Sequence, residues 1–273
     1  MEFGLVLVWL VALLALGAAA LPLSALIFRD LADRGAAFAI PLALATIGIV
    51  AYVVGQVSFG LPALAAGLLV LVVGSFVAAD RVDFDYEAFL APALVFTAAF
   101  LLIVLVRAAD PAIDALAGEK FLDFGLLQSV LRTDVLPPED MWFAGEPVQY
   151  YYGGQLIAGL LTMLTGTGAA YAYNLSLAAF FGAFVVAGYG LSSNIAATYG
   201  VSPRIAGLLG AFFVGIAANL HTAARLVLWV LPDGIAGPAA SALGLSAESA
   251  NWVPADFSYW AASRVIPGSI NEF

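Results

Sequence analysis

The chain has 273 residues, of which 63% are hydrophobic and only 10% charged, and its mean hydropathy is +1.03. The net charge of −10 disfavours a nucleic-acid partner, because phosphates attract basic surfaces. With no cysteine and one histidine, disulfides, thiolate zinc sites and cysteine nucleophiles are excluded and few imidazole metal sites remain. We therefore assign no metal ligand and no certain cofactor, and only a divalent cation held by oxygen atoms stays open.

Long, continuously apolar runs predict an all-α, polytopic membrane protein with about six spanning helices, an interfacial helix and a large ordered outer loop. A helix needs about 20 apolar residues to cross a bilayer core, and runs without alternation favour helices over barrel strands. The predicted spans are Gly4–Phe28, Ala36–Val53, Leu61–Ala79, Ala88–Val106, Tyr171–Leu191 and Arg204–Ala218, the last of which tilts or extends toward Leu231.

The first span is predicted to be a retained helix rather than a signal peptide. Glu2 stands where a signal peptide usually has basic residues, and the apolar run is too long for one. Arg29 and Arg34 flank the first connection, which the positive-inside rule places in the cytoplasm. The N-terminus and the segment that follows the fourth span then lie outside the cell membrane. Eight arginines against the single Lys120, in an acidic chain, also predict a halophilic source.

The run Gly153–Leu164 is too short to cross and is predicted to lie along the interface, which would return the tail to the outer face. The tail stops at Phe273 directly after a Pro-Gly turn, so we expect the N-terminal portion of a longer protein. Four regions result: a four-helix membrane region 1–107, an outer loop with its interfacial helix 108–170, further membrane helices 171–231, and an interfacial tail 232–273.

Ala108–Tyr152, called here the polar island, carries eight of the nineteen acids and enough aromatic residues to fold. Within it, Glu119 and Asp123 are four residues apart and would share one face of a helix. A carboxylate just outside the bilayer could act as a general base on an acceptor hydroxyl. The alternative, which the spacing alone favours, is a pair of solvated acids.

The polar island ends in Tyr150, Tyr151 and Tyr152, three rings that cannot all point to one side of a helix or strand. One interpretation is an aromatic belt at the membrane surface. The other is a pocket for a sugar or a lipid head group, lined by these tyrosines and Trp142.

His221 and Arg225 are four residues apart near the end of an apolar stretch. They could reach the head groups of membrane lipids, or serve a function within the membrane. Arg225, or Arg264 in the tail, could hold a lipid phosphate through its forked donors. A metal site at Glu139 and Asp140 is a weaker hypothesis, because adjacent acids before a loop are common.

The string PPEDMWFAGEPVQYYYGG at residues 137–154 resembles the signature of archaeal and Chloroflexi membrane proteins named for a Tyr-Tyr-Tyr motif, the Chlor_Arch_YYY family. The upstream string GEKFLDFGLLQSVLRTD at 118–134, Ala218–His221 and the tail YWAASRVIPGSINEF are similar to the same family. Members of that family continue past the NEF tripeptide into further membrane helices.

The layout of that family resembles the GT-C integral membrane glycosyltransferases, which use sugars carried on polyprenyl phosphates. The resemblance implies that Asp123 is the catalytic base. We further expect Glu119, Trp142 and the tyrosines to bind substrate, and His221, Arg225 and Arg264 to bind phosphate. The resemblance also implies that Gly153–Leu164 is the interfacial helix of the fold. Activity would then need the later helices.

Two alternatives belong to other classes. A lipid transporter would carry ionisable residues near the bilayer midplane, and the first four spans contain none. A non-catalytic scaffold or partner subunit would bind a larger membrane protein.

Overall fold

A computed structural model describes residues 3–107, 119–217, 221–243, 245, 251 and 253. They fall into two units, the first ending at Gly215 and the second beginning at Ile216, and each is described by itself.

Five helices of the first unit are long and apolar enough to cross a membrane. The predicted all-α membrane fold is therefore confirmed. These helices are α1 (Phe3–Ile27), α2 (Ala39–Gly55, preceded by the 3-10 turn η1, Ala36–Phe38), α3 (Leu61–Ala79), α4 (Tyr86–Val106) and α7 (Ala169–Thr198).

Two shorter apolar helices, α6 (Gly153–Thr165) and α8 (Pro203–Gly215), have 13 residues each. The bounds of α6 agree with the predicted interfacial run. The helix ends at Gly166, whose φ of 66° is a left-handed conformation that favours glycine. The amide of Gly166 donates to the carbonyl of Thr162, so one of the last carbonyls of α6 is satisfied.

The long helix α7 runs to Thr198, beyond the predicted end at Leu191. The extension carries Asn194, which is buried and exchanges hydrogen bonds with Asp33 in the α1–α2 connection, at 2.8 and 3.1 Å. The same carboxylate accepts from the amides of Gly35 and Ala37, each at 3.0 Å. A polar side chain thus continues the helix because a distant loop satisfies it.

The core of the first unit lies among the long helices, where Trp9, Phe96 and Phe100 are fully buried. Helices approach closely where one of them carries glycine. A Cβ at Gly67 of α3 would come within 3.0 Å of the Ile47 carbonyl oxygen of α2, so only glycine fits without a shift.

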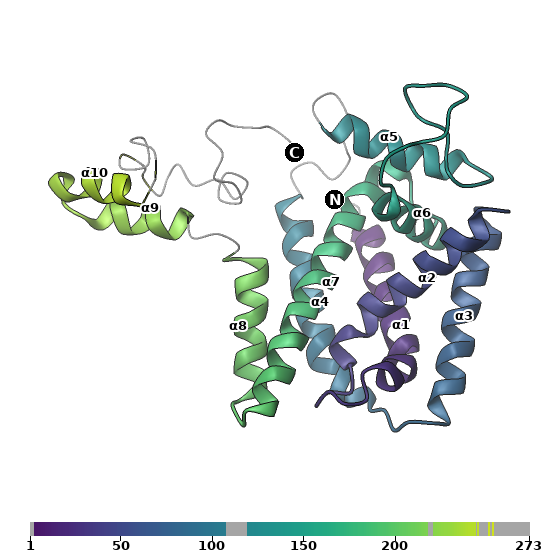
Figure 1. Ribbon diagram of the computed structural model, residues 1–273, viewed down its shortest axis with the longest axis horizontal. Helices are drawn as coiled ribbons and strands as arrows, with labels where there is room; N and C mark the ends of the chain where they lie inside the picture. The colour runs from purple at the N-terminus through teal and green to yellow at the C-terminus, as the bar shows by residue number, and fades with distance from the viewer. Residues whose placement is uncertain are drawn as a thin grey trace. The chain divides into compact units, whose positions relative to one another are not determined.

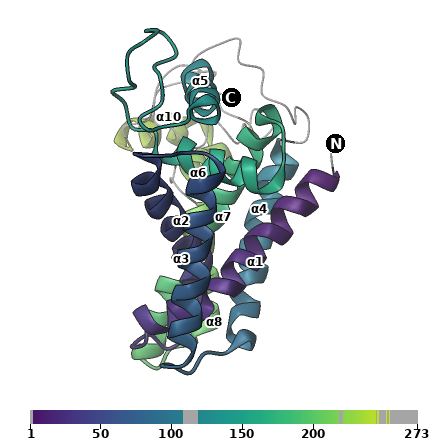
Figure 2. The same ribbon diagram turned by 90° about the vertical axis from the view of Figure 1, so that its right-hand side faces the viewer.

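Helix α5 (Glu119–Arg132) and α6 lie at the same end of the bundle as the start of α1, as Figures 1 and 2 show. The α1–α2, α3–α4 and α7–α8 connections lie at the opposite end (Figure 1). We call these the α5/α6 end and the connection end. Among the described residues, five helices rather than the predicted six have the length of a span, because α8, over the predicted sixth span, has only 13 residues.

The second unit contains α9 (His221–Val230) and α10 (Asp233–Ala242), which contact each other. The helical spacing predicted for His221 and Arg225 is present in α9.

Candidate active site at the α5/α6 end

Helix α5 is held to the bundle by one apolar side, made of Leu126, Leu127 and Val130, each no more than 1% exposed. Its approach to α6 is close: a Cβ at Gly159 would lie 2.9 Å from Cγ1 of Val130. This packing fixes the position of the polar side chains that precede the buried residues on α5.

Asp123 on α5 faces α6. Its Oδ1 accepts a hydrogen bond from Nε2 of Gln155, at 3.0 Å, in partly buried surroundings. The predicted helix around Asp123 is confirmed, whereas its role as a base stays a prediction. Sequence patterns do not identify Gln155 as a site residue, because a single glutamine in an apolar helix forms no motif.

Two further contacts continue from Asp123 along the same end of the bundle. Its neighbour Phe124 packs edge-on against Tyr173 of α7, with ring centroids 6.1 Å apart. The residue after that tyrosine, Asn174, is buried and accepts a 2.7 Å hydrogen bond from Nη2 of Arg107. The three contacts link α4, α5, α6 and α7 at this end of the bundle.

Arg107 is the functional candidate that the sequence interpretation missed. It caps the C-terminal end of α4 and is half-buried, although in the sequence it marks only the end of an apolar run. A basic residue at a helix C-terminus is favoured by the helix dipole, so its position alone suggested a structural role. Its contact with Asn174 joins residues 67 positions apart in the sequence, and no local sequence pattern predicts it.

The tyrosine triplet divides as predicted, with its rings facing different partners. Tyr150 and Tyr151 stack at 4.0 Å, share a 2.6 Å hydrogen bond between their hydroxyls and are both exposed. Tyr152 instead packs on Tyr52 of α2, with ring centroids 6.5 Å apart. Burial, and then the neighbouring Tyr52, raise the pKa of the Tyr152 hydroxyl above its ordinary value.

Trp142 lies in the loop between α5 and α6, and its ring stacks on Phe121 with centroids 6.5 Å apart and planes 10° apart. By the helical repeat, Phe121 projects from roughly the opposite side of α5 to Asp123. The ring contact of Trp142 thus lies on a different side of α5 from the Asp123–Gln155 contact, and the substrate-binding role of Trp142 stays a prediction.

Glu139 and Asp140 serve the backbone of that loop. Asp140 Oδ1 accepts from the amides of Trp142 and Phe143 at 2.8 and 3.1 Å, and Glu139 Oε1 accepts from Gly145 at 2.6 Å. Among the described residues, no group of three or more acids, histidines or cysteines could hold a metal ion. The two acids thus act as turn-stabilising acceptors.

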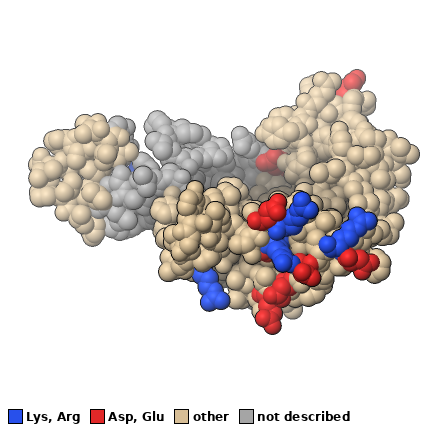
Figure 3. Space-filling model, turned by 60° about the horizontal axis from the view of Figure 1, so that its bottom comes forward, with Lys and Arg blue, Asp and Glu red and all other residues tan. Residues whose placement is uncertain are grey.

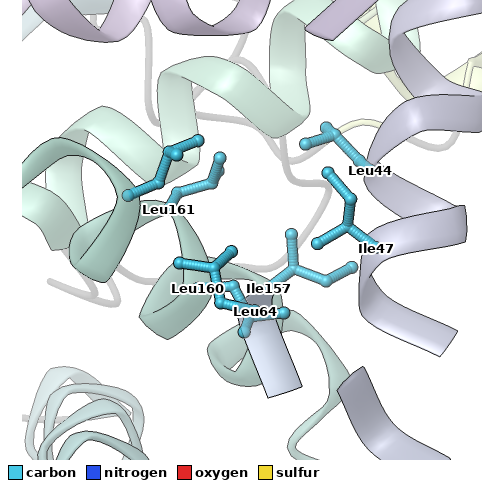
Figure 4. A pocket seen from close by; sticks show the side chains of 7 residues that line it. Leu44, Ile47, Leu64, Ile157, Leu160 and Leu161 are labelled. Carbon is cyan, nitrogen blue, oxygen red and sulfur yellow. The ribbon is translucent and has the colours of Figure 1, made fainter. Parts of the chain in front are cut away.

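The bundle interior beneath α6 is apolar and closed. A hollow between α2, α3 and α6 has room for about 10 Å³, too little to do more than admit one water molecule. Figure 4 shows that leucine and isoleucine side chains surround it, with Leu44, Ile47, Leu64 and Ile157 among them. A substrate therefore cannot be held there.

The connection end carries a band of mixed charge, visible in Figure 3. Arg34 Nη1 donates to the Asp83 carbonyl at 2.6 Å and lies 3.6 Å from its carboxylate, which ties two connections together. The arginines of this end are Arg29, Arg34, Arg81 and Arg204.

Several predicted site residues lie partly or wholly outside the described residues. Arg264 is outside them, and of Glu119 and His221 only the helical backbone is described. Arg225, in the second unit, is half-buried, and its Nε has no hydrogen-bond partner among the described residues.

The fold and the site define a polytopic helical membrane protein with a polar and aromatic site at one end of its bundle. Residues 46–273 match the family model described as "Uncharacterized membrane protein (DUF2298)". The chain belongs to that family. A search of curated proteins and a search of solved structures each gave no match.

Proposed function

We propose that the protein is a membrane glycosyltransferase that moves a sugar from a polyprenyl-phosphate donor to an acceptor, with the α5/α6 end facing outside. The observation that carries the proposal is the Asp123–Gln155 hydrogen bond, which holds a half-buried carboxylate on an amphipathic helix at the bundle end. A donor anchored by its lipid in the bilayer would present its sugar at this level. Residues 118–154 resemble the Tyr-Tyr-Tyr-motif family, whose layout resembles the GT-C glycosyltransferases, and this resemblance supports the same function.

In the proposed reaction, the Asp123 carboxylate takes the proton of an acceptor hydroxyl. The acceptor oxygen then attacks the anomeric carbon of the donor sugar, and the bond between that carbon and the phosphate oxygen breaks. The polyprenyl phosphate leaves with the electron pair of that bond, and the configuration at the anomeric carbon inverts. Gln155 donates to Asp123 Oδ1 and orients the carboxylate.

Negative charge on the departing phosphate needs a cation, and Arg107 supplies one within the first unit. Its guanidinium is oriented by the buried Asn174 at the α5/α6 end, and forked donors suit phosphate oxygens. The phosphate-binding role of His221, Arg225 and Arg264 stays a prediction.

Transport is disfavoured by the distribution of charge in the spanning helices. Across the five long helices, the one acidic or basic residue is Glu87, in the first turn of α4. A lipid or ion pathway through the bundle would need such groups near the bilayer midplane.

The proposal is tested by replacing the gene in its host with the Asp123→Asn form of the full-length protein. Mass spectrometry of glycolipids and glycoproteins should show loss of one glycan, or its shortening by one sugar. The matched control is Glu146→Gln, an exposed acid of the neighbouring loop, which should leave the profile intact. An unchanged profile with Asp123→Asn, at equal protein levels, removes Asp123 as the base.

A further inference from the structure

Beside α5, the protein has an open hollow of about 500 Å³ with both polar and apolar walls. This size is within the range of small-molecule sites. Its walls come from the C-terminal half of α5 and from the loop that follows, and they include Ser129, Arg132, Asp134, Glu139, Asp140 and Trp142.

One wall of the hollow is a fixed aromatic surface. Trp142 is 56% exposed, yet its ring is backed by Phe121 at 6.5 Å in near-parallel planes. Its backbone amide and the next one donate to Asp140 Oδ1, so the turn that carries the ring is held in place. A large, rigid and exposed ring offers contact area at low entropic cost.

The charges around the hollow identify the kind of ligand. The walls carry one cation, Arg132, against the three acids Asp134, Glu139 and Asp140. Arg132 Nε donates to the Gln128 carbonyl, at 3.1 Å, and its terminal nitrogens have no hydrogen-bond partner among the described residues. A net negative rim repels phosphates, nucleotides and sulfated sugars, but it offers acceptors and a donor to hydroxyl groups.

We infer that this hollow binds a neutral saccharide. A pyranose ring has one face of C–H groups, which can stack on Trp142, and a rim of hydroxyls that can donate to the carboxylates and accept from Arg132. The site is distinct from the Asp123–Gln155 contact, because neither of these residues lines the hollow. Saccharide binding here does not depend on the proposed transfer reaction.

The test is isothermal titration of the purified full-length protein in detergent with two probes, mannopentaose as a neutral saccharide and a sulfated pentasaccharide of equal length. Mannopentaose should bind, and the sulfated probe should bind at least tenfold more weakly. Trp142→Ala should weaken mannopentaose binding about tenfold or more, and Trp142→Phe should restore part of it. The matched control is Phe143→Ala, which removes an exposed ring of the same loop that does not line the hollow.

Three results would overturn the inference: no heat with mannopentaose, equal or tighter binding of the sulfated probe, or binding unchanged by Trp142→Ala. Size-exclusion profiles and thermal unfolding establish that each variant is folded, and a misfolded Trp142→Ala is replaced by Trp142→Phe and Arg132→Gln for the same comparison. Asp123→Asn should bind mannopentaose as the wild type does. Failure of the proposed transfer reaction is thereby distinguished from failure of saccharide binding.

Discussion

Asp123 on α5 and Gln155 on α6 are joined by a 3.0 Å hydrogen bond across 32 positions of sequence, and this bond fixes the carboxylate at the bundle end. Gln155→Leu removes the donor and leaves an apolar side chain that is one bond shorter. A hydrogen bond to a charged group contributes about 1.5–3 kcal/mol, so the transfer rate should fall at least about tenfold. The loss should appear in kcat with little change in KM for the donor, because Gln155 positions Asp123 and does not bind the lipid.

The matched control for that prediction is Gln128→Leu, a glutamine on α5, the helix that carries Asp123. Kinetics of Gln155→Leu identical to those of Gln128→Leu would contradict a positioning role.

Arg107 should affect the donor rather than the chemical step. Arg107→Gln removes the cation and keeps a polar, though shorter, side chain. We expect KM for the polyprenyl-phosphate sugar to rise about tenfold or more, which corresponds to about 1.4 kcal/mol of lost binding. Steady-state kinetics over a range of donor concentrations measure this. Arg29→Gln, at the exposed connection end, is the control, and an equal rise in both variants would refute the assignment.

Trp9 and Thr167 provide a test of the fold that is independent of function. The buried indole Nε1 of Trp9 donates to Thr167 Oγ1 at 2.9 Å, and Thr167→Val leaves that N–H without its acceptor. The free energy of unfolding in mixed micelles should fall by about 1–3 kcal/mol. Thr198→Val removes an exposed hydroxyl that is hydrogen-bonded only within its own helix. It should lower the free energy of unfolding by less than Thr167→Val does. Equal stability of the two variants would argue against the Trp9–Thr167 contact.

The proposed orientation in the membrane can be determined by labelling single introduced cysteines, because the chain has no cysteine of its own. A membrane-impermeant maleimide applied to intact cells should label Gln149→Cys, an exposed position beside the tyrosine triplet. It should label Asp30→Cys, at the connection end, only after permeabilisation. The reverse pattern would invert the topology and place the candidate site in the cytoplasm.

Apolar run length was enough to predict the helices, because a bilayer span is a local property of sequence. The bounds of α3 were predicted to the residue, whereas α7 continues past its apolar run because Asn194 finds a distant partner in Asp33. The predicted helix around Asp123 is present for the same local reason.

The partners of the site residues could not be predicted in the same way. The contacts of Asp123 with Gln155 and of Arg107 with Asn174 join residues far apart in sequence, and neither forms a local motif. The separation of Trp142 from Asp123 depends on how the loop returns over α5, which is set by hydrogen bonds of Glu139 and Asp140 to nearby amides. Patterns of residue type along the chain do not contain that geometry.

The central claim is that Asp123 deprotonates an acceptor during transfer from a lipid-linked donor. The most direct measurement is release of polyprenyl phosphate from a radiolabelled polyprenyl-phosphate sugar, in proteoliposomes that contain the full-length protein and an oligosaccharide acceptor. The wild type should release polyprenyl phosphate with matching label in the acceptor. Asp123→Asn should lower the rate at least about a hundredfold, in the range of general-base contributions. Release at the wild-type rate by folded Asp123→Asn would contradict the account.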